Sequence, residues 1–393
     1  MGKWEMVRFG DVCIIERGGS PRPIDKYVTD DIDGINWIKI GDTTPNSMYI
    51  THTKEKIIPE GMKKSRYVKP GDFLLSNSMS FGRPYILKID GCIHDGWLVI
   101  RDENSNFDKR FLFYYLSSDR TYAEFKGLVE GGVVNNLNSK MVRELSIPLP
   151  PLPIQQKIAD ILDRTSALIE KRKEQIVKLD LLVKSQFAEM FGNPMKIEKN
   201  WAIKAIKEFA TVKIGPFGSL LHAEDYIEDG VPIVNPSHIK DGKITIDPKL
   251  TVTTEKYREL SSYAMQNGDI VLGRRGEIGR CAVVGNGEYL CGTGSMFIRM
   301  EQDYLPIMLQ RIISSDTMRQ VLEDKAVGVT MLNLNAGMIS GLEVIMPPLD
   351  LQNRFAEFVQ QVEKSKFEMQ QGLGKLELLY KSLMQKCFGG ELF

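Results

Sequence analysis

The chain has 393 residues, enough for two or more domains with sizeable cores, and its 42% hydrophobic and 26% charged residues are typical of a soluble globular protein. Lys plus Arg and Asp plus Glu both number 51, so the formal net charge is zero, which argues against non-specific coating of nucleic acid but leaves specific DNA binding open. Five scattered cysteines without a Cys-x-x-Cys pair predict neither a zinc site nor a disulfide framework. Together with the lack of an apolar signal or membrane-spanning run, they favour a soluble cytoplasmic protein.

The first part of the chain, residues 1–150, is predicted to be a mixed globular segment. "GDFLLS" (Gly71–Ser76) predicts a buried strand that is entered through a Gly-Asp turn. We interpret Arg83–Arg101 as a hairpin that turns at Asp90-Gly91, and Lys109–Phe125 as helical. Strands that precede helices favour an α+β fold over repeating βαβ units.

A long helix is predicted in residues 151–195. Prolines up to Pro153 oppose a helix before Ile154, and apolar residues then recur at coiled-coil spacing. The helix is expected to end at Gly192-Asn193-Pro194, where a glycine is followed by a proline. The apolar stripe consists of Ile154, Ile158, Ile161, Leu168, Ile176, Leu179, Val183, Phe187 and Met190.

The second half of the chain repeats the first at an offset of about 197 positions. "LSIPLPPLPIQQKIADIL" (Leu145–Leu162) returns as "LEVIMPPLDLQNRFAEFV" (Leu342–Val359). A second globular segment is therefore expected in residues 196–347, with a hairpin in Gly279–Met300 that turns at Gly285–Gly287. A second long helix is expected in residues 348–393.

Two apolar stripes of matched length most simply pack on each other. Some 37 residues at 1.5 Å each give a rod of roughly 55 Å. An antiparallel pair would relate the two globular segments by a pseudo-twofold axis. The predicted fold class is therefore α+β, with two pseudo-twofold-related mixed α/β domains joined by two long antiparallel coiled-coil helices. Gly372 and Gly374 in the second helix each cost about 1 kcal/mol relative to alanine, so packing must hold this helix.

The sequence shows no motif of catalytic machinery. It has no G-x-x-x-x-G-K-[ST] loop, no H-E-x-x-H motif and no nucleophile elbow. The Gly-rich loop and the Asn/Asp-Pro-Pro-aromatic tetrapeptide expected of a methyltransferase are also missing. The four histidines lack metal-ligand spacing, so ordinary structural or surface roles are expected for them. We therefore expect a binding protein without catalytic or metal-binding residues.

Three matched pairs of loops carry the candidate binding residues. Arginine forks match guanine edges and phosphates, so the Arg-Arg-Gly loop of the second repeat is the strongest candidate, against the alternative of a solvated turn. In the third pair, a structural turn and DNA contact are equally supported. The candidates are Ser76, Asn77, Ser78 and Arg83 opposite Arg274, Arg275 and Arg280; Ser20 and Arg22 opposite Lys213 and Phe217; and Lys39 opposite Asn235, Ser237 and His238.

The full length of the chain resembles the specificity (S) subunits of type I restriction–modification systems. A Pro-Leu-Pro-Pro-Leu run before a long helix is the most specific feature of this resemblance. The motifs that carry it are "IPLPPLPIQQKIADILD" (Ile147–Asp163), "SQFAEMFGNP" (Ser185–Pro194), "PPLDLQNRFAEF" (Pro347–Phe358) and "FGGELF" (Phe388–Phe393).

The resemblance implies a non-catalytic subunit that reads a split sequence in double-stranded DNA. Residues 1–150 and 196–347 would be target recognition domains, one for each half-site, and residues 151–195 and 348–393 would be spacer helices. The helices would dock two modification subunits, which bind S-adenosylmethionine and methylate adenine. Restriction subunits, which use ATP and Mg²⁺, would join the complex, and this chain itself would hold no cofactor. The second helix has Asp350 and Asn353 where the first has Pro153 and Gln156, so equal docking on both helices stays open.

Two other classes of function compete with this interpretation. One is a fused restriction or modification enzyme with its own catalytic site, against which the missing cofactor motifs count. The other is a coiled-coil adaptor that binds proteins at both ends, against which the matched but chemically different polar loops count. Salt-dependent DNA binding would separate a DNA reader from the adaptor, because phosphate contacts release counterions.

Overall fold

A computed structural model describes residues 4–44, 47–78, 81–130, 136–193, 199, 201–217, 220–276, 278–326 and 333–392. Contacts within the chain divide it into two compact units. Unit 1 consists of Met1–Glu174 and Gln370–Phe393, and unit 2 consists of Gln175–Met369. Each unit therefore combines one globular segment with one half of each long helix.

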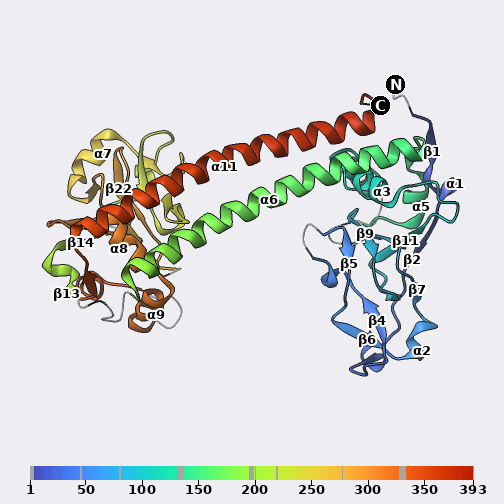
Figure 1. Ribbon diagram of the computed structural model, residues 1–393, viewed down its shortest axis with the longest axis horizontal. Helices are drawn as coiled ribbons and strands as arrows, with labels where there is room; N and C mark the ends of the chain where they lie inside the picture. Colours follow the sequence, from blue (N-terminus) through green and yellow to red (C-terminus); the bar gives the residue numbers. More distant parts are fainter. Residues whose placement is uncertain are drawn as a thin grey trace. The chain divides into compact units, whose positions relative to one another are not determined.

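In unit 1, the strands come mostly before the helices, as the sequence predicts (Figure 1). The strands are β1 (Met6–Arg8), β2 (Ile14–Arg17), β3 (Val28–Thr29), β4 (Ile35–Ile38), β5 (Tyr49–Ile50), β6 (Glu55–Ile57), β7 (Arg66–Val68), β8 (Phe73–Ser76), β9 (Pro84–Leu87), β10 (Gly91–Ile93), β11 (Trp97–Arg101) and β12 (Ser146–Pro148). The helices are α1 (Phe9–Val12), η1 (Ile24–Lys26), η2 (Ile40–Asp42), α2 (Pro59–Met62), α3 (Lys109–Leu116), α4 (Asp119–Glu130), α5 (Ser139–Glu144) and the first half of α6 (Leu152–Phe191).

Unit 2 follows nearly the same order of elements. Its strands are β13 (Ala202–Ala205), β14 (Ala210–Ile214), β15 (Val231–Val234), β16 (Ile239–Lys240), β17 (Lys243–Ile244), β18 (Thr251–Val252), β19 (Ala264–Met265), β20 (Ile270–Gly273), β21 (Cys281–Val283), β22 (Tyr289–Cys291), β23 (Ser295–Met300) and β24 (Glu343–Met346). Its helices are η3 (Ile206–Glu208), η4 (Ala223–Asp225), η5 (Pro236–His238), α7 (Thr254–Glu259), η6 (Ser261–Tyr263), α8 (Pro306–Ile313), α9 (Asp316–Lys325), α10 (Ala336–Ser340) and the first half of α11 (Leu349–Gly389).

The two units share most of their sheet topology. In unit 1, the sheets have the strand orders β2-β11-β8-β9-β5 and β3-β6-β4-β10-β7. Unit 2 repeats most of this arrangement with the orders β14-β23-β20-β21 and β18-β15-β22-β19. The pairs β4–β10 and β15–β22 are both parallel. The ladders β1–β12 and β13–β24 join the first strand of each globular segment to the strand that leads into a long helix.

The predicted buried strand β8 is confirmed, together with the Gly-Asp turn before it, and β20 of unit 2 repeats both features. Gly71 (φ +93°) and Gly268 (φ +91°) adopt the left-handed conformation that favours glycine. Asp72 then accepts a hydrogen bond from a backbone N–H three residues earlier, at 3.0 Å, and Asp269 does so at 2.7 Å. Every residue of both strands is buried. The Gly-Asp pair therefore turns the chain into the centre of a sheet in each repeat.

The two predicted hairpins are wrong. β9 pairs with β8, whereas β10 pairs with β4 and β7 in the other sheet, so Asp90-Gly91 connects two sheets. β21 and β22 are divided between sheets in the same way. Gly91 is needed for close packing, because a Cβ built on it would lie 2.5 Å from the backbone oxygen of Asn36. Apolar runs that flank a glycine do not reveal in which sheet each run lies.

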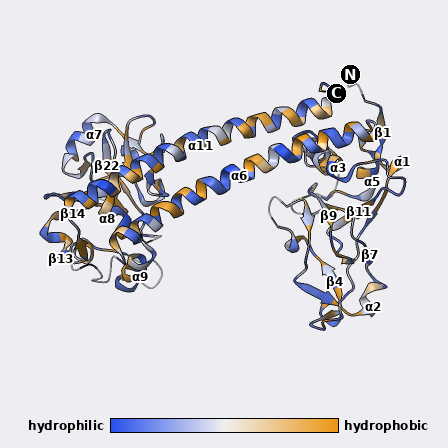
Figure 2. Cartoon of the chain, viewed as in Figure 1, coloured by the Kyte–Doolittle hydropathy of each residue, from blue (hydrophilic) through white to orange (hydrophobic). Residues whose placement is uncertain are grey.

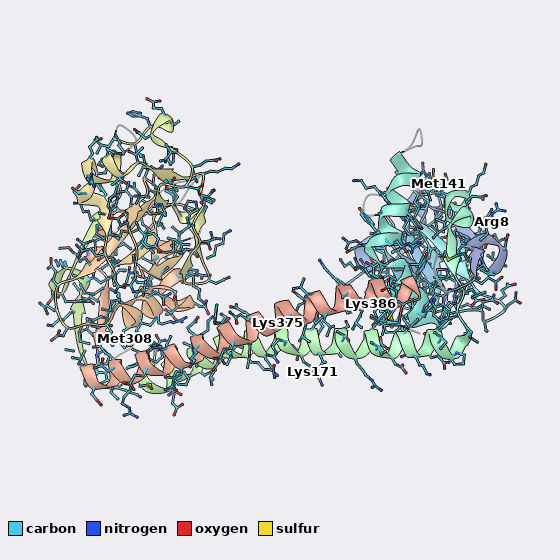
Figure 3. All side chains as sticks on the ribbon, turned by 90° about the horizontal axis from the view of Figure 1, so that it is seen from above. Arg8, Met141, Lys171, Met308, Lys375 and Lys386 are labelled. Carbon is cyan, nitrogen blue, oxygen red and sulfur yellow. The ribbon has the colours of Figure 1, made fainter. Side chains whose placement is uncertain are left out.

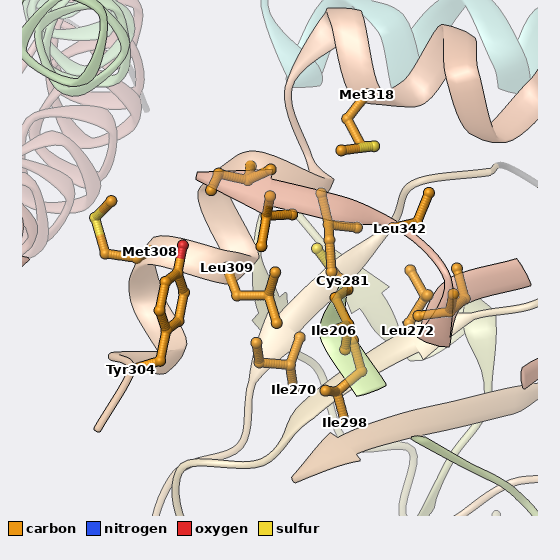
Figure 4. Packing of buried hydrophobic residues seen from close by; sticks show 14 of the residues in the cluster. Ile206, Ile270, Leu272, Cys281, Ile298, Tyr304, Met308, Leu309, Met318 and Leu342 are labelled. Atoms are coloured by element: carbon orange, nitrogen blue, oxygen red, sulfur yellow. The ribbon is translucent and has the colours of Figure 1, made fainter. Parts of the chain in front are cut away.

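The largest core of unit 2 lies between the sheet β14-β23-β20-β21 and the helices of this unit (Figure 4). Ile270, Leu272 and Ile298 from the sheet pack with Met308 and Leu309 from α8. All of these side chains are fully buried. In unit 1, an equivalent core joins β8 and β11 to α3 and α6.

Each unit pairs opposite ends of the two long helices. In unit 1, Ile158 and Leu162 near the start of α6 share a core with Phe388 at the end of α11. In unit 2, Phe187 near the end of α6 lies against Phe355 near the start of α11, with ring centroids 5.4 Å apart. Both pairings are antiparallel. Figure 2 shows hydrophobic residues alternating with hydrophilic residues along both helices.

The helix boundaries agree with the sequence to within a few residues. α6 begins at Leu152 rather than Ile154, because a proline is tolerated in the first turn of a helix. Gly192 (φ +72°) follows α6 and Gly390 (φ +73°) follows α11, and both adopt the left-handed conformation that ends helices. Among the described residues, no helix is both long and apolar enough to cross a membrane.

Gly372 makes room for the arginine that interrupts the apolar stripe of α6. A Cβ built on Gly372 would lie 3.3 Å from Arg172 Nη1. Figure 3 labels Lys171 on α6 and Lys375 on α11, and both residues lie close to this point in the chain. The glycine and the arginine therefore face each other in the helix pair of unit 1.

Candidate nucleic-acid interface

In unit 1, the three loops predicted to bind DNA meet at the turn between β10 and β11. We call this turn, His94–Gly96, the central turn of unit 1. The loop that begins at Gly18 donates a backbone N–H to the residue after the turn, and the loop that begins at Ser76 donates one to the turn itself. The turn also donates a backbone N–H to the loop that contains Lys39, at the end of β4. These bonds are Gly18 N–H to Trp97 O (2.9 Å), Asn77 N–H to Gly96 O (2.9 Å) and His94 N–H to Ile38 O (3.3 Å).

The turn between β22 and β23, Gly292–Gly294, is the central turn of unit 2 and has the same three backbone bonds. They are Gly215 N–H to Ser295 O, Arg274 N–H to Gly294 O and Gly292 N–H to Val234 O, each 3.0 Å long. A fourth bond also matches, since Asn77 O accepts from Leu137 N–H and Arg274 O accepts from Leu334 N–H, both at 2.9 Å. Asn77 is therefore equivalent to Arg274, and Asp95 is equivalent to Thr293.

Asp95 ties together the side chains around the central turn of unit 1. The Ser20 hydroxyl donates to Asp95 Oδ1 at 2.8 Å, and Arg22 Nη2 lies 3.5 Å from Asp95 Oδ2. The Asp95 carbonyl oxygen accepts from Arg17 Nε and from Asn77 Nδ2, both at 3.0 Å. Partial burial raises the pKa of the Asp95 carboxyl, but the Ser20 hydroxyl and nearby positive charge outweigh this, so its pKa lies below the usual value.

Sequence reasoning missed Asp95. A signal for it is present, because "IHDGW" (Ile93–Trp97) and "CGTGS" (Cys291–Ser295) occupy matched positions in the two repeats, and only the first has a carboxylate in the turn. A turn of this kind follows a buried strand in both copies. Position alone, without the contacts to Ser20 and Arg22, gave no reason to select it.

Ser20, Arg22 and Lys39 line one groove of unit 1, together with His94, Asp95 and Glu55. Arg22 is exposed, whereas Lys39 is half-buried and forms an ion pair with Glu55. The structure thus brings together predicted residues from two loops that are separate in the sequence.

The loop of unit 1 that begins at Ser76 is partly buried. Ser76 and Asn77 are only 1% and 2% exposed. The Ser76 hydroxyl accepts a hydrogen bond from the Arg83 backbone N–H at 2.9 Å, and this bond joins the two ends of the loop. Ser78 is half-buried, and the exposed Arg83 lines a second groove beside Phe81.

In unit 2, the arginine loop presents two different arginines. Arg274 is half-buried, and its Nε donates to Asn333 Oδ1 at 3.1 Å. Burial and the neighbouring Arg275 lower the pKa of the Arg274 guanidinium, although arginine remains charged at neutral pH. Arg275 is exposed, and Arg280 is half-buried. Asn333 is a further residue that sequence reasoning did not select, and it holds Arg274 in place.

The remaining candidates of unit 2 divide in the same way. Phe217 is 65% exposed, and Lys213 is also exposed, with its Nζ 5.2 Å from the centroid of the Tyr263 ring. Ser237 is exposed, but His238 is buried and its Nδ1 lies 2.9 Å from the Ile233 carbonyl oxygen. Asn235 packs against the central turn, because a Cβ built on Gly292 would lie 2.1 Å from Asn235 Oδ1.

A second pair of matched surfaces lies at the ends of the long helices. In unit 1, Ser117–Asp119 between α3 and α4 line a groove with Tyr380–Lys381 of α11. In unit 2, Ser314–Asp316 between α8 and α9 line a groove with Val183–Lys184 of α6. Both turns have the sequence Ser-Ser-Asp. Unlike the loops predicted to bind DNA, these helix-end grooves are therefore similar in the two units.

The family model of the type I restriction modification DNA specificity domain matches residues 1–179 and 198–378 of the sequence, so the chain belongs to this family. The predicted resemblance and fold class are confirmed. The family is one of DNA specificity domains, in agreement with the expectation of a chain that is not itself an enzyme.

Known relatives and structures cover nearly the full chain. The type I restriction enzyme MjaVIII specificity subunit of Methanocaldococcus jannaschii is 20% identical over 99% of this chain and 93% of its own length. The EcoBI specificity subunit of Escherichia coli is 20% identical over 92% and 80%. A structure described for assembly of the type I R-M system is 19% identical, with a TM-score of 0.67 over 100% and 98% of the two chains. The S subunit from M. genitalium is 13% identical, with a TM-score of 0.55 over 98% and 96%.

Proposed function

We propose that this chain reads a split DNA target, with one half-site for each unit, as part of a type I restriction–modification complex in the cytoplasm. The observation that carries the proposal is the pair of central turns, in which one backbone arrangement presents different side chains. A shared scaffold with different polar groups is what two different half-sites require. Residues 1–150 and 196–347 act as the recognition domains, and residues 151–195 and 348–393 act as the spacer helices.

The side chains proposed for direct contact are those that the structure leaves exposed or half-exposed. They are Ser20, Arg22, Lys39, Ser78 and Arg83 in unit 1, and Lys213, Phe217, Ser237, Arg274, Arg275 and Arg280 in unit 2. Ser76, Asn77 and His238 are buried, and the half-buried Asn235 packs against the central turn. These four residues shape the loops and act on DNA through them. Buried groups that already have partners would lose those partners on direct contact.

The same chain docks two modification subunits, one at each helix-end groove. Each groove lies beside a pair of exposed leucines at matched positions, Leu378-Leu379 in unit 1 and Leu181-Leu182 in unit 2. Exposed apolar patches next to a groove are typical of protein interfaces. Two similar surfaces suit two copies of one partner. S-adenosylmethionine binds to these partners, and ATP with Mg²⁺ binds to the restriction subunits that join them.

Reconstitution tests this function. The purified chain alone is expected to show no methyl transfer, nuclease or ATPase activity. With the modification subunit and S-adenosylmethionine, methylation-sensitive sequencing should recover a split motif with one methyladenine in each half. Methyl transfer by the chain alone would instead support the fused enzyme, and salt-independent or undetectable DNA binding would support the adaptor.

A further inference from the structure

The central turns of the two units differ in charge although their backbones match. Asp95 in unit 1 is equivalent to Thr293 in unit 2, and four backbone hydrogen bonds around the two turns match. The turn therefore folds without a carboxylate. Asp95 is not required for the geometry of the turn, and its charge calls for another explanation.

One carboxylate oxygen of Asp95 accepts a hydrogen bond from a half-buried serine, and the other lies near an exposed arginine. Oδ1 accepts from the Ser20 hydroxyl at 2.8 Å. Oδ2 lies 3.5 Å from Arg22 Nη2, which is longer than the roughly 2.7–2.9 Å of a strong charge-assisted bond. The Arg22 side chain is 83% exposed and the Asp95 side chain is 33% exposed. Arg22 can therefore leave Oδ2 without disturbing the contact between Ser20 and Oδ1.

Phosphates repel a carboxylate in a DNA-binding groove, so a favourable contact of the carboxylate must offset this repulsion. In the major groove, the partners for such an acceptor are the exocyclic amino groups, N4 of cytosine and N6 of adenine. Unit 2 has an uncharged threonine at the position of Asp95, and the opposite chemistry lies in the loop that bonds to its central turn. There, Arg274 and Arg275 offer donors to the acceptor edge of guanine.

We propose that Asp95 is a specificity-determining residue of unit 1. Its Oδ2 accepts a hydrogen bond from one exocyclic amino group in the half-site that unit 1 reads, while Arg22 moves to a neighbouring phosphate. This proposal rests on the proposed function, and it adds the chemical class of one base contact.

The test is Asp95→Asn in the full chain, assembled with the modification subunit. Asparagine keeps the size of the side chain and an acceptor for Ser20, but it removes the charge and adds a donor. Methylation-sensitive sequencing should show one position of one half-site relaxed, with discrimination at that position reduced about tenfold to a hundredfold. The other half-site should be unchanged. Thr293→Asn is the matched control, and it should leave the half-site of unit 1 unaltered.

Modified duplexes separate the two sources of the amino group. Replacing a cytosine by 2-pyrimidinone removes N4, and replacing an adenine by purine removes N6. The replacement that weakens binding of the original chain, but not of Asp95→Asn, identifies the base. If neither replacement separates the two proteins, the proposal is wrong.

Two outcomes keep failure of this inference distinct from failure of the proposed function. An unchanged motif with active methylation overturns the role of Asp95 alone. No split motif from the original chain overturns the proposed function. If Asp95→Asn does not fold, Asp95→Thr takes its place, because unit 2 folds the same turn with threonine.

Discussion

At the scale of single residues, burial decides which polar side chains of the loops are available for contact with a partner. Asn77 and Arg274 occupy equivalent positions, but Asn77 is buried and bonded to Asp95, whereas Arg274 is half-buried. The sequence identified both loops correctly as polar turns at strand ends. It could not show that Asn77 is buried, because the covering turn lies 18 positions further along the chain.

Arg275→Ala should relax one position in the half-site of unit 2 and leave that of unit 1 intact. Arg275 is exposed beside the central turn, and an arginine–guanine contact carries about 1–3 kcal/mol of discrimination. Methylation-sensitive sequencing of the reconstituted complex measures the motif. Ser78→Ala, at the equivalent position, is the control and should affect only the other half. A change in both halves would contradict the assignment of this loop to unit 2.

Gly292→Ala should destabilise unit 2. The added Cβ would lie 2.1 Å from Asn235 Oδ1 and 2.9 Å from the Val234 carbonyl oxygen, so the loop must shift. A loss of about 1–3 kcal/mol is expected from such overpacking, measured by denaturant unfolding. Gly285→Ala is the control, because its Cβ would meet none of the described residues within 4 Å. Equal stability of the two variants would show that the turn is not tightly packed.

At the scale of elements, local signals predicted the long helices better than the sheets. Prolines before α6 and the glycine after each helix fix the ends, because they act on the backbone next to them. The pairing of β9 and β10 failed because strand partners come from distant parts of the chain. The Gly-Asp turns succeeded because the left-handed glycine is a local requirement.

Leu378→Glu and Leu181→Glu should each remove one modification subunit from the complex. Both leucines are exposed beside the helix-end grooves, at 70% and 55%, and a charge there opposes burial in an interface. Native mass spectrometry should show one modification subunit bound for either variant and none for the double variant. Lys375→Ala, on the same helix as Leu378, should retain two. Two bound copies in the double variant would mean that docking occurs elsewhere.

At the scale of the whole molecule, duplication was the most informative feature of the sequence. The offset of about 197 positions predicted two units with one topology, and the matched sheets agree with it. The register of the helices was not predictable, because a heptad pattern does not identify which residue faces which. Arg172 faces Gly372 in unit 1, and Lys366 Nζ bonds to Asp180 Oδ1 at 2.5 Å in unit 2.

We expect the paired helices to set the gap between the half-sites. Inserting seven residues after Glu170 in α6, and seven after Gly374 in α11, lengthens both helices by one heptad, or about 10.5 Å. The register between Arg172 and Gly372 indicates that these two points lie close together along the pair. At 3.4 Å per base pair, the gap should widen by roughly three base pairs.

Both half-site sequences should stay the same, because the insertions lie outside every loop that is proposed to bind DNA. An insertion in α6 alone should lose methylation of the widened target, since the apolar stripes would no longer align. If the double insertion kept methylation active with the original gap, the helices would not be the element that measures the distance between half-sites.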